Sequence, residues 1–204
     1  MTEKELFELT VEWWMWALPQ DGTVSPLKKG GNFGLRGDQS VFFMGATIDR
    51  DITGVLRETQ IPAKTPILCA VLNTNISGKE HPDEFSEGEN PPAGKVKEKV
   101  KDIIDDKETD AELVVLGPNE QMTSRFHKNE LRRIEHPTDS NLIQMNVPKE
   151  TEVIKDAMCA LAGYYLHIKS LDPGVYIMNI AGKAPYVGGG PMFETNATYK
   201  LTVV

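Results

Sequence analysis

Hydrophobic positions recur at helical spacing near the start of the chain. Leu6, Leu9, Trp13 and Trp16 follow one another at intervals of three or four residues. This spacing places their side chains on one face of an α-helix. The pattern therefore predicts an amphipathic helix over residues 3–17.

The ends of this helix are also indicated by the sequence. Thr2 and Glu5 have the spacing of a capping box, in which each side chain accepts a hydrogen bond from the other residue's backbone N–H. Leu18 precedes Pro19, and a residue before proline avoids the helical region. We expect the helix to end there.

The three tryptophans of the chain all fall within this helix. Trp13 and Trp16 share the apolar face, which predicts packing on the core of the protein. Trp14 projects off that face, and we predict that it is exposed to solvent or binds a partner.

A second amphipathic pattern appears in the middle of the chain. Val96, Val100, Ile103 and Ile104 again have helical spacing, and charged residues lie between them. This pattern predicts a helix over residues 95–107.

Most of the remaining apolar runs are short and bounded by turn-forming residues, which is typical of β-strands. The predicted strands cover residues 40–46, 55–61, 67–72, 112–116, 141–147, 162–170, 175–181 and 197–204. The 67–72 run is continuous and predicts burial on both faces. A turn at residues 171–174 predicts that the two strands beside it form a β-hairpin. Residues 119–140 are polar and predict no element.

Short strands separated by turns, with helices at two places, predict a mainly β fold. We expect an antiparallel β-sandwich, of the jelly-roll or immunoglobulin-like type, with an N-terminal amphipathic helix and one inserted helix. A length of 204 residues without repeats or linkers predicts a single domain over residues 1–204.

The charge balance limits the classes of partner. A net charge of -8 and a pI near 5.1 argue against nucleic acid, whose phosphates are bound by clustered Lys and Arg. No apolar run approaches the ~20 residues that span a bilayer. The acidic start, Met1–Glu5, does not match a signal peptide, which predicts a cytoplasmic protein unless a leader has been removed.

Two cysteines are too few for a disulfide scaffold. Cys69 and Cys159 each lie in an apolar stretch, which favours buried free thiols over a bridge between them.

One acidic loop is a candidate metal site. His81, Asp83, Glu84, Glu87 and Glu89 offer one imidazole and four carboxylates. Calcium prefers oxygen ligands of this kind, but the order of an EF-hand loop is missing. A solvated acidic loop explains the same residues, and we favour that interpretation. No other cofactor is indicated.

Three further groups of residues have a structural explanation that we prefer to a functional one. Asp49 and Asp51 would share a face of a strand, but they also suit a turn between two strands. The Gly188–Gly190 run lacks the Lys-Ser or Lys-Thr of a phosphate-binding loop. The one basic cluster is interrupted by acids and suits a solvated surface. It comprises Arg125, His127, Lys128, Arg132 and Arg133.

Nucleophilic catalysis has no sequence support. The chain contains no Gly-x-Ser-x-Gly motif, and neither cysteine has a basic neighbour that would lower its pKa. We therefore lean against an enzyme.

Several short motifs, in order, carry a resemblance to a known family. They are Glu12–Leu18 with its Trp-Trp-Met-Trp-Ala run, Ser25–Leu27, Val41–Ala46, Ile61–Leu68, Ala162–Tyr165, Leu171–Gly174 and Thr198–Val203. This order resembles a family of uncharacterised, mostly secreted bacterial β-rich proteins with a W-W-x-W-A opening and a T-Y-x-L-T-V final strand. The resemblance implies no established activity. Secreted members carry cysteines at two places where this chain has Phe33 and Thr59, which fits a reducing compartment or an assembled state.

Two functions remain open at this stage. The first is a non-enzymatic β-sandwich module that acts through protein–protein contacts or self-assembly, with Trp14 in the contact. The alternative is a protein that binds a small molecule or carbohydrate, including a calcium-assisted hydrolase, at the His81–Glu89 loop.

Overall fold

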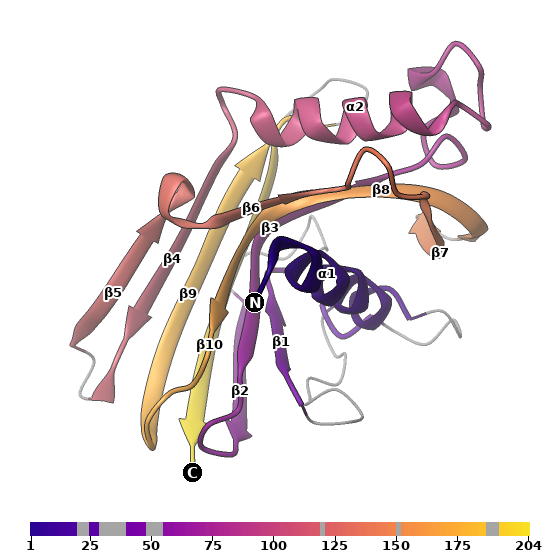
Figure 1. Cartoon of the computed structure of the whole chain (residues 1–204). Helices are drawn as coiled ribbons and strands as arrows, with labels where there is room; N and C mark the ends of the chain where they lie inside the picture. The colour runs from indigo at the N-terminus through magenta and orange to yellow at the C-terminus, as the bar shows by residue number, and fades with distance from the viewer. Residues whose placement is uncertain (20–24, 29–39, 48–54, 119–120, 150–151, 187–191) are drawn as a thin grey trace.

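The computed structural model describes residues 1–19, 25–28, 40–47, 55–118, 121–149, 152–186 and 192–204. Two five-stranded β-sheets, called sheet A and sheet B below, pack face to face, and two helices pack against them (Figure 1). The predicted β-sandwich with an N-terminal helix and one inserted helix is confirmed.

Sheet A has the strand order β1-β3-β8-β6, and β7 pairs with β8. Its strands are β1 (Phe42–Gly45), β3 (Ile67–Ile76), β6 (Arg132–Glu135), β7 (Ile143–Lys149) and β8 (Glu152–Ile168). The long strand β8 pairs with β7 over its first half and with β3 and β6 over its second half.

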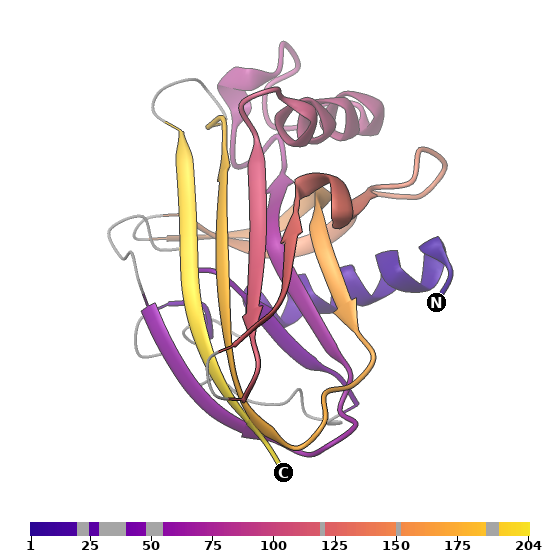
Figure 2. The same cartoon turned by 90° about the vertical axis from the view of Figure 1, so that its left-hand side faces the viewer.

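Sheet B has the strand order β2-β10-β9-β4-β5, and its outer face is turned to the viewer in Figure 2. Its strands are β2 (Val55–Ile61), β4 (Asp110–Leu116), β5 (Met122–His127), β9 (Gly174–Ala184) and β10 (Phe193–Val203). Buried and less buried positions alternate along β4 and β10. This period of two is expected of strands with one face on the core and one toward water.

Both sheets are mixed rather than purely antiparallel. β1 runs parallel to β3, and β2 runs parallel to β10. Between β1 and β3 the chain crosses to sheet B, forms β2 and returns. The two neighbours in sheet A can therefore point the same way without a helix between them.

The predicted hairpin around residues 171–174 is wrong. Both strands exist as β8 and β9, but β8 belongs to sheet A and β9 to sheet B. The turn connects the two sheets instead of two neighbours in one sheet. β9 instead forms antiparallel pairs with β10, over eleven residues of each strand, and with β4 on its other side.

Two separate apolar clusters hold the molecule together. The inner cluster fills the space between the sheets, and the outer cluster lies between sheet A and α1 (Glu3–Ala17). Neighbouring residues of one strand alternate between them: Phe42 belongs to the inner cluster and Phe43 to the outer one. The central strands of sheet A are thus buried on both faces, as the continuous run at residues 67–72 predicted.

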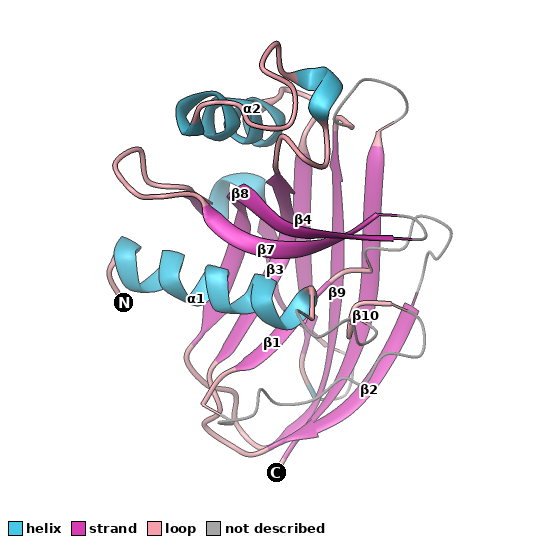
Figure 3. Ribbon diagram, turned by 90° about the vertical axis from the view of Figure 1, so that its right-hand side faces the viewer, coloured by secondary structure: helices cyan, strands magenta, loops and turns pink. Residues whose placement is uncertain are grey.

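Helix α1 lies across the outer face of sheet A (Figure 3). It begins with the predicted capping box between Thr2 and Glu5. Trp13 is 1% exposed, and its indole N–H donates to the Met44 carbonyl at 2.8 Å. The predicted anchoring of the helix by Trp13 is confirmed.

Helix α2 (Ala93–Asp105) covers one end of the sandwich and contacts β8 and β3. Its side chains at positions 96, 100, 103 and 104 join the inner cluster, as their helical spacing predicted. Within the described part of the chain, neither helix has the length and apolar character needed to cross a membrane.

Candidate functional site: a groove along β3

The second half of β3 has a partner on only one side. β8 pairs with β3 as far as Ile76, but β1 pairs with it only as far as Ala70. Beyond that point no described strand pairs with the β1 side of β3. The backbone N–H and C=O groups on this edge are therefore without a ladder partner among the described residues.

The chain leaves sheet A after β1 because its backbone is held by sheet B. The Gly45 carbonyl accepts hydrogen bonds from Arg57 at 2.6 Å and from the Tyr199 hydroxyl at 2.8 Å. The Thr47 carbonyl accepts from Thr195 at 2.7 Å. These bonds hold the chain from Gly45 to Thr47 against sheet B, and its pairing with β3 ends at Gly45 and Ala70.

A groove of about 940 Å³ follows this edge. All residues from Ala70 to Asn75 line it. Side chains of a strand alternate between two faces, so a continuous run of lining residues means that the edge of the strand borders the groove. The end of β9 with the two residues after it and the start of β10 form one wall, and the η1 turn (Pro82–Glu84) with α2 forms another.

Two asparagines on β3 add side-chain hydrogen-bonding groups to the floor. Asn73 Nδ2 donates to the buried Tyr165 hydroxyl at 3.4 Å, and Asn75 Nδ2 contacts Cys159 Sγ at 4.0 Å. Their amide oxygens accept no hydrogen bond from the described residues. The groove therefore offers acceptors on its floor in addition to the strand edge.

The groove has a charged group near each end that is not neutralised within the described chain. Lys28 and Asp83 both line it, and neither has an ion-pair partner among the described residues. By contrast, Glu84 pairs with Lys99 at 2.6 Å.

Trp14 is more buried than the sequence predicted. It is 4% exposed, because it packs edge-to-face on Trp13 and joins the outer cluster. It nevertheless lines the groove. Its contact with a partner stays a prediction.

The predicted metal ligands are not brought together. His81 Nε2 lies 3.6 Å from a Glu80 oxygen, Glu84 pairs with Lys99, and Glu87 forms an ion pair with Lys95. Across the described residues, no group of three or more His, Cys, Asp or Glu side chains could hold a metal ion. His81, Asp83 and Glu84 instead line one end of the groove, without Glu87.

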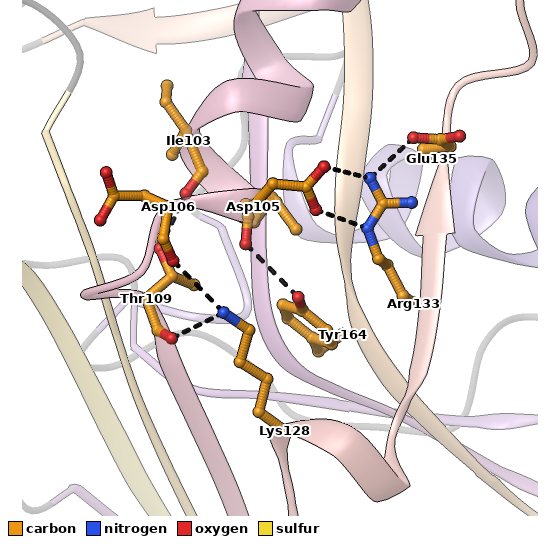
Figure 4. A network of polar contacts seen from close by, with 9 residues as sticks. Ile103, Asp105, Asp106, Thr109, Lys128, Arg133, Glu135 and Tyr164 are labelled. Carbon is orange, nitrogen blue, oxygen red and sulfur yellow. Dashed lines mark hydrogen bonds and ion pairs between the residues drawn. The ribbon is translucent and has the colours of Figure 1, made fainter.

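The predicted basic cluster divides between separate structural contacts (Figure 4). Arg133 binds Asp105 with two hydrogen bonds, at 2.7 and 2.9 Å, and Glu135 with a third at 2.8 Å. Lys128 donates to the carbonyls of Asp106 and Thr109 at 3.3 and 2.8 Å. A cavity of about 520 Å³ is lined by Lys128 and Arg133, and both side chains are already engaged in these contacts.

Both cysteines are buried free thiols, as predicted. Burial raises the pKa of Cys159 to about 12, and the nearby Glu80 charge acts in the same direction. Burial also raises the pKa of Cys69. A raised pKa disfavours the thiolate, which is the form in which a cysteine acts as a nucleophile.

Two other predicted groups, Asp49 with Asp51 and the Gly188–Gly190 run, lie outside the described residues. Sequence reasoning missed the groove itself. The polar run Asn73-Thr74-Asn75 interrupts an otherwise apolar strand, and this was the available signal.

Comparison with family models, with curated proteins and with solved structures gave no match. The resemblance to the secreted β-rich family therefore stays a prediction.

Proposed function

We propose that this protein is an interaction module that binds an extended segment of a partner protein along the free edge of β3. The observation that carries the proposal is the edge from Val71 to Asn75, which has no described strand beside it and borders the groove. An extended segment would add to sheet A as a further strand.

The chemistry of a strand edge supports this proposal. Unpaired backbone N–H and C=O groups are a template for another strand, and proteins normally cover or interrupt such edges. Here the edge is recessed between walls from sheet B and from the η1 turn. A recessed edge admits a single narrow segment, and at about 3.3 Å per residue six residues would occupy roughly 20 Å of it.

A small polar molecule, such as a carbohydrate, is the second candidate for the same groove. The amide oxygens of Asn73 and Asn75, which accept no hydrogen bond from the described residues, favour it. The groove volume lies within the range of ligand pockets, about 300–1,000 Å³.

A peptide library displayed on phage tests the first proposal. Octapeptides selected on the protein would be resynthesised with single N-methyl groups at successive positions. An added strand donates alternate N–H groups to its neighbour. We expect N-methylation to weaken binding at every second position, measured by calorimetry.

Two results would contradict strand addition. One is loss of binding without the period of two, and the other is the absence of any selected peptide. A thermal shift with members of a glycan panel, together with no peptide binding, would favour the second candidate.

A further inference from the structure

Lys28 and Asp83, which have no ion-pair partner among the described residues, lie near opposite ends of the groove floor. Lys28 follows Leu27, whose carbonyl accepts from Arg57 at 3.0 Å, and Arg57 also binds Gly45. Gly45 is paired with Ala70 at the start of the floor. Lys28 therefore belongs to the Ala70 end.

Asp83 belongs to the other end. It lies in the η1 turn, which follows β3 directly and is tied to it by the hydrogen bond from the His81 N–H to the Ser77 carbonyl. Its neighbour Glu84 is held on α2 by Lys99.

We infer that the partner segment is itself bipolar, with an acidic side chain facing Lys28 and a basic side chain facing Asp83, about five residues apart. This inference rests on the proposed function. It is supported by charge complementarity, because Lys28 and Asp83 line the groove and neither has an ion-pair partner among the described residues.

A segment bound in the opposite direction would place its basic side chain beside Lys28 and its acidic side chain beside Asp83. An exposed pair contributes about 0.2–1 kcal/mol, which is about 1.4- to fivefold in Kd for each end at low ionic strength. The charges thus select the direction of the bound segment, while the strand edge supplies the sequence-independent contacts. The preference should weaken at high salt.

The test uses the same displayed octapeptide library on three proteins. The first is the unchanged chain, and the second carries Lys28→Glu with Asp83→Lys. The third, a matched control with the same change in charge, carries Lys169→Glu with Asp172→Lys, at exposed positions outside the groove.

On the unchanged chain and on the control we expect selected peptides to be enriched in acids at one end and in bases about five positions away. On the Lys28/Asp83 variant the order should be inverted. Circular dichroism and thermal melting verify that all three proteins are folded.

The outcomes separate the two proposals. Selected peptides that show the period of two on N-methylation, but no inversion in the Lys28/Asp83 variant, would overturn the bipolar segment and leave the interaction module standing. No selected peptide on any of the three proteins would overturn both.

Discussion

The Trp13 ring, which belongs to the outer cluster, packs directly against Gly45. The Trp13 ring is fixed by its hydrogen bond to Met44 and by edge-to-face contacts with Trp14 and Trp16. A Cβ atom at Gly45 would overlap the Trp13 ring. The backbone of Gly45 cannot move aside easily, because Tyr199 and Arg57 hold it.

The change Gly45→Ala should therefore lower the free energy of unfolding by about 1–3 kcal/mol, as overpacking does in a fixed core. Urea denaturation measures it. Gly94→Ala is the control, since nothing lies near the added methyl group and alanine favours a helix. A Gly45→Ala protein as stable as the control would show that the Trp13 ring has room to shift.

His136 is a buried imidazole with one hydrogen bond. Its Nε2 lies 2.7 Å from the Asn141 carbonyl and donates to it, so Nδ1 carries the lone pair. Nδ1 is buried without a partner among the described residues, and the Phe7 ring of α1 packs edge-on against the imidazole. Burial lowers the pKa of His136, and the nearby Lys97 charge acts in the same direction, against the Asn141 bond.

Stability should consequently fall on mild acidification. The pKa of His136 is ordinary in the unfolded chain and lower in the folded one, so below about pH 6.5 the unfolded state takes up the proton first. The contribution of neutral His136 to the free energy of unfolding is complete above that pH. It is lost as the pH falls through the pKa of His136 in the folded chain. As the pH falls from about 7.5 to about 5, the free energy of unfolding should decrease less steeply in His136→Gln than in the unchanged chain. Equal slopes would refute this role.

The carbonyl groups of the last turn of α2 have no hydrogen-bond donor within the helix. Residues outside the helix donate to them instead. Thr109 Oγ1 donates to Ile103 at 2.7 Å, and the Tyr164 hydroxyl of β8 donates to Ile104 at 3.4 Å. Lys128, in the η3 turn (Lys128–Glu130), donates to the Asp106 carbonyl. A cation at this position also interacts favourably with the helix dipole.

Replacing Lys128 with methionine keeps the apolar stem and removes these hydrogen bonds. We expect a loss of about 1–2 kcal/mol in unfolding free energy. Lys107→Met, at an exposed position just beyond the helix, should change stability little. Equal effects of the two changes would mean that the loss comes from net charge and not from the helix end.

Elements were easier to predict than their pairing. The spacing of Val96, Val100 and Ile103 determines a helix through local geometry alone. β8 and β9 have the alternation of strands and a turn between them, which suits a hairpin and a connection between sheets equally well. The sequence did not predict β5 and β6, because they lie in a polar stretch without strand periodicity. Pairing with β4 and β8 holds them in the sheets.

Across the whole molecule, one buried polar cluster joins the two sheets to each other. Tyr199 of β10 donates to Gly45 of β1 and accepts from Arg57 of β2 at 2.7 Å. The Arg57 side chain is 1% exposed. This cluster also holds the chain at the point where its pairing with β3 ends, and beyond that point no described strand pairs with this side of β3.

The change Tyr199→Phe should lower the free energy of unfolding by about 1–3 kcal/mol, because removal of the hydroxyl takes a hydrogen-bond partner from buried groups. Thr198→Val is the control, since that hydroxyl bonds Asn179 within sheet B alone. Hydrogen exchange should show β1 losing protection in Tyr199→Phe and not in Thr198→Val. Uniform loss across both sheets would contradict a local link between β1 and sheet B.

By itself the sequence determined α1, α2, most of the strands, the burial of β3 on both faces and the sandwich class. These follow from periodicity and capping, which act between residues close in the chain. The tertiary structure alone decided which strands are neighbours and that Trp14 is buried. It also decided that, among the described residues, the acidic loop gathers no metal ligands and no strand pairs with β3 beyond Ala70 on the β1 side. Each of these depends on contacts between distant segments, such as Tyr199 with Gly45, and no local pattern encodes them.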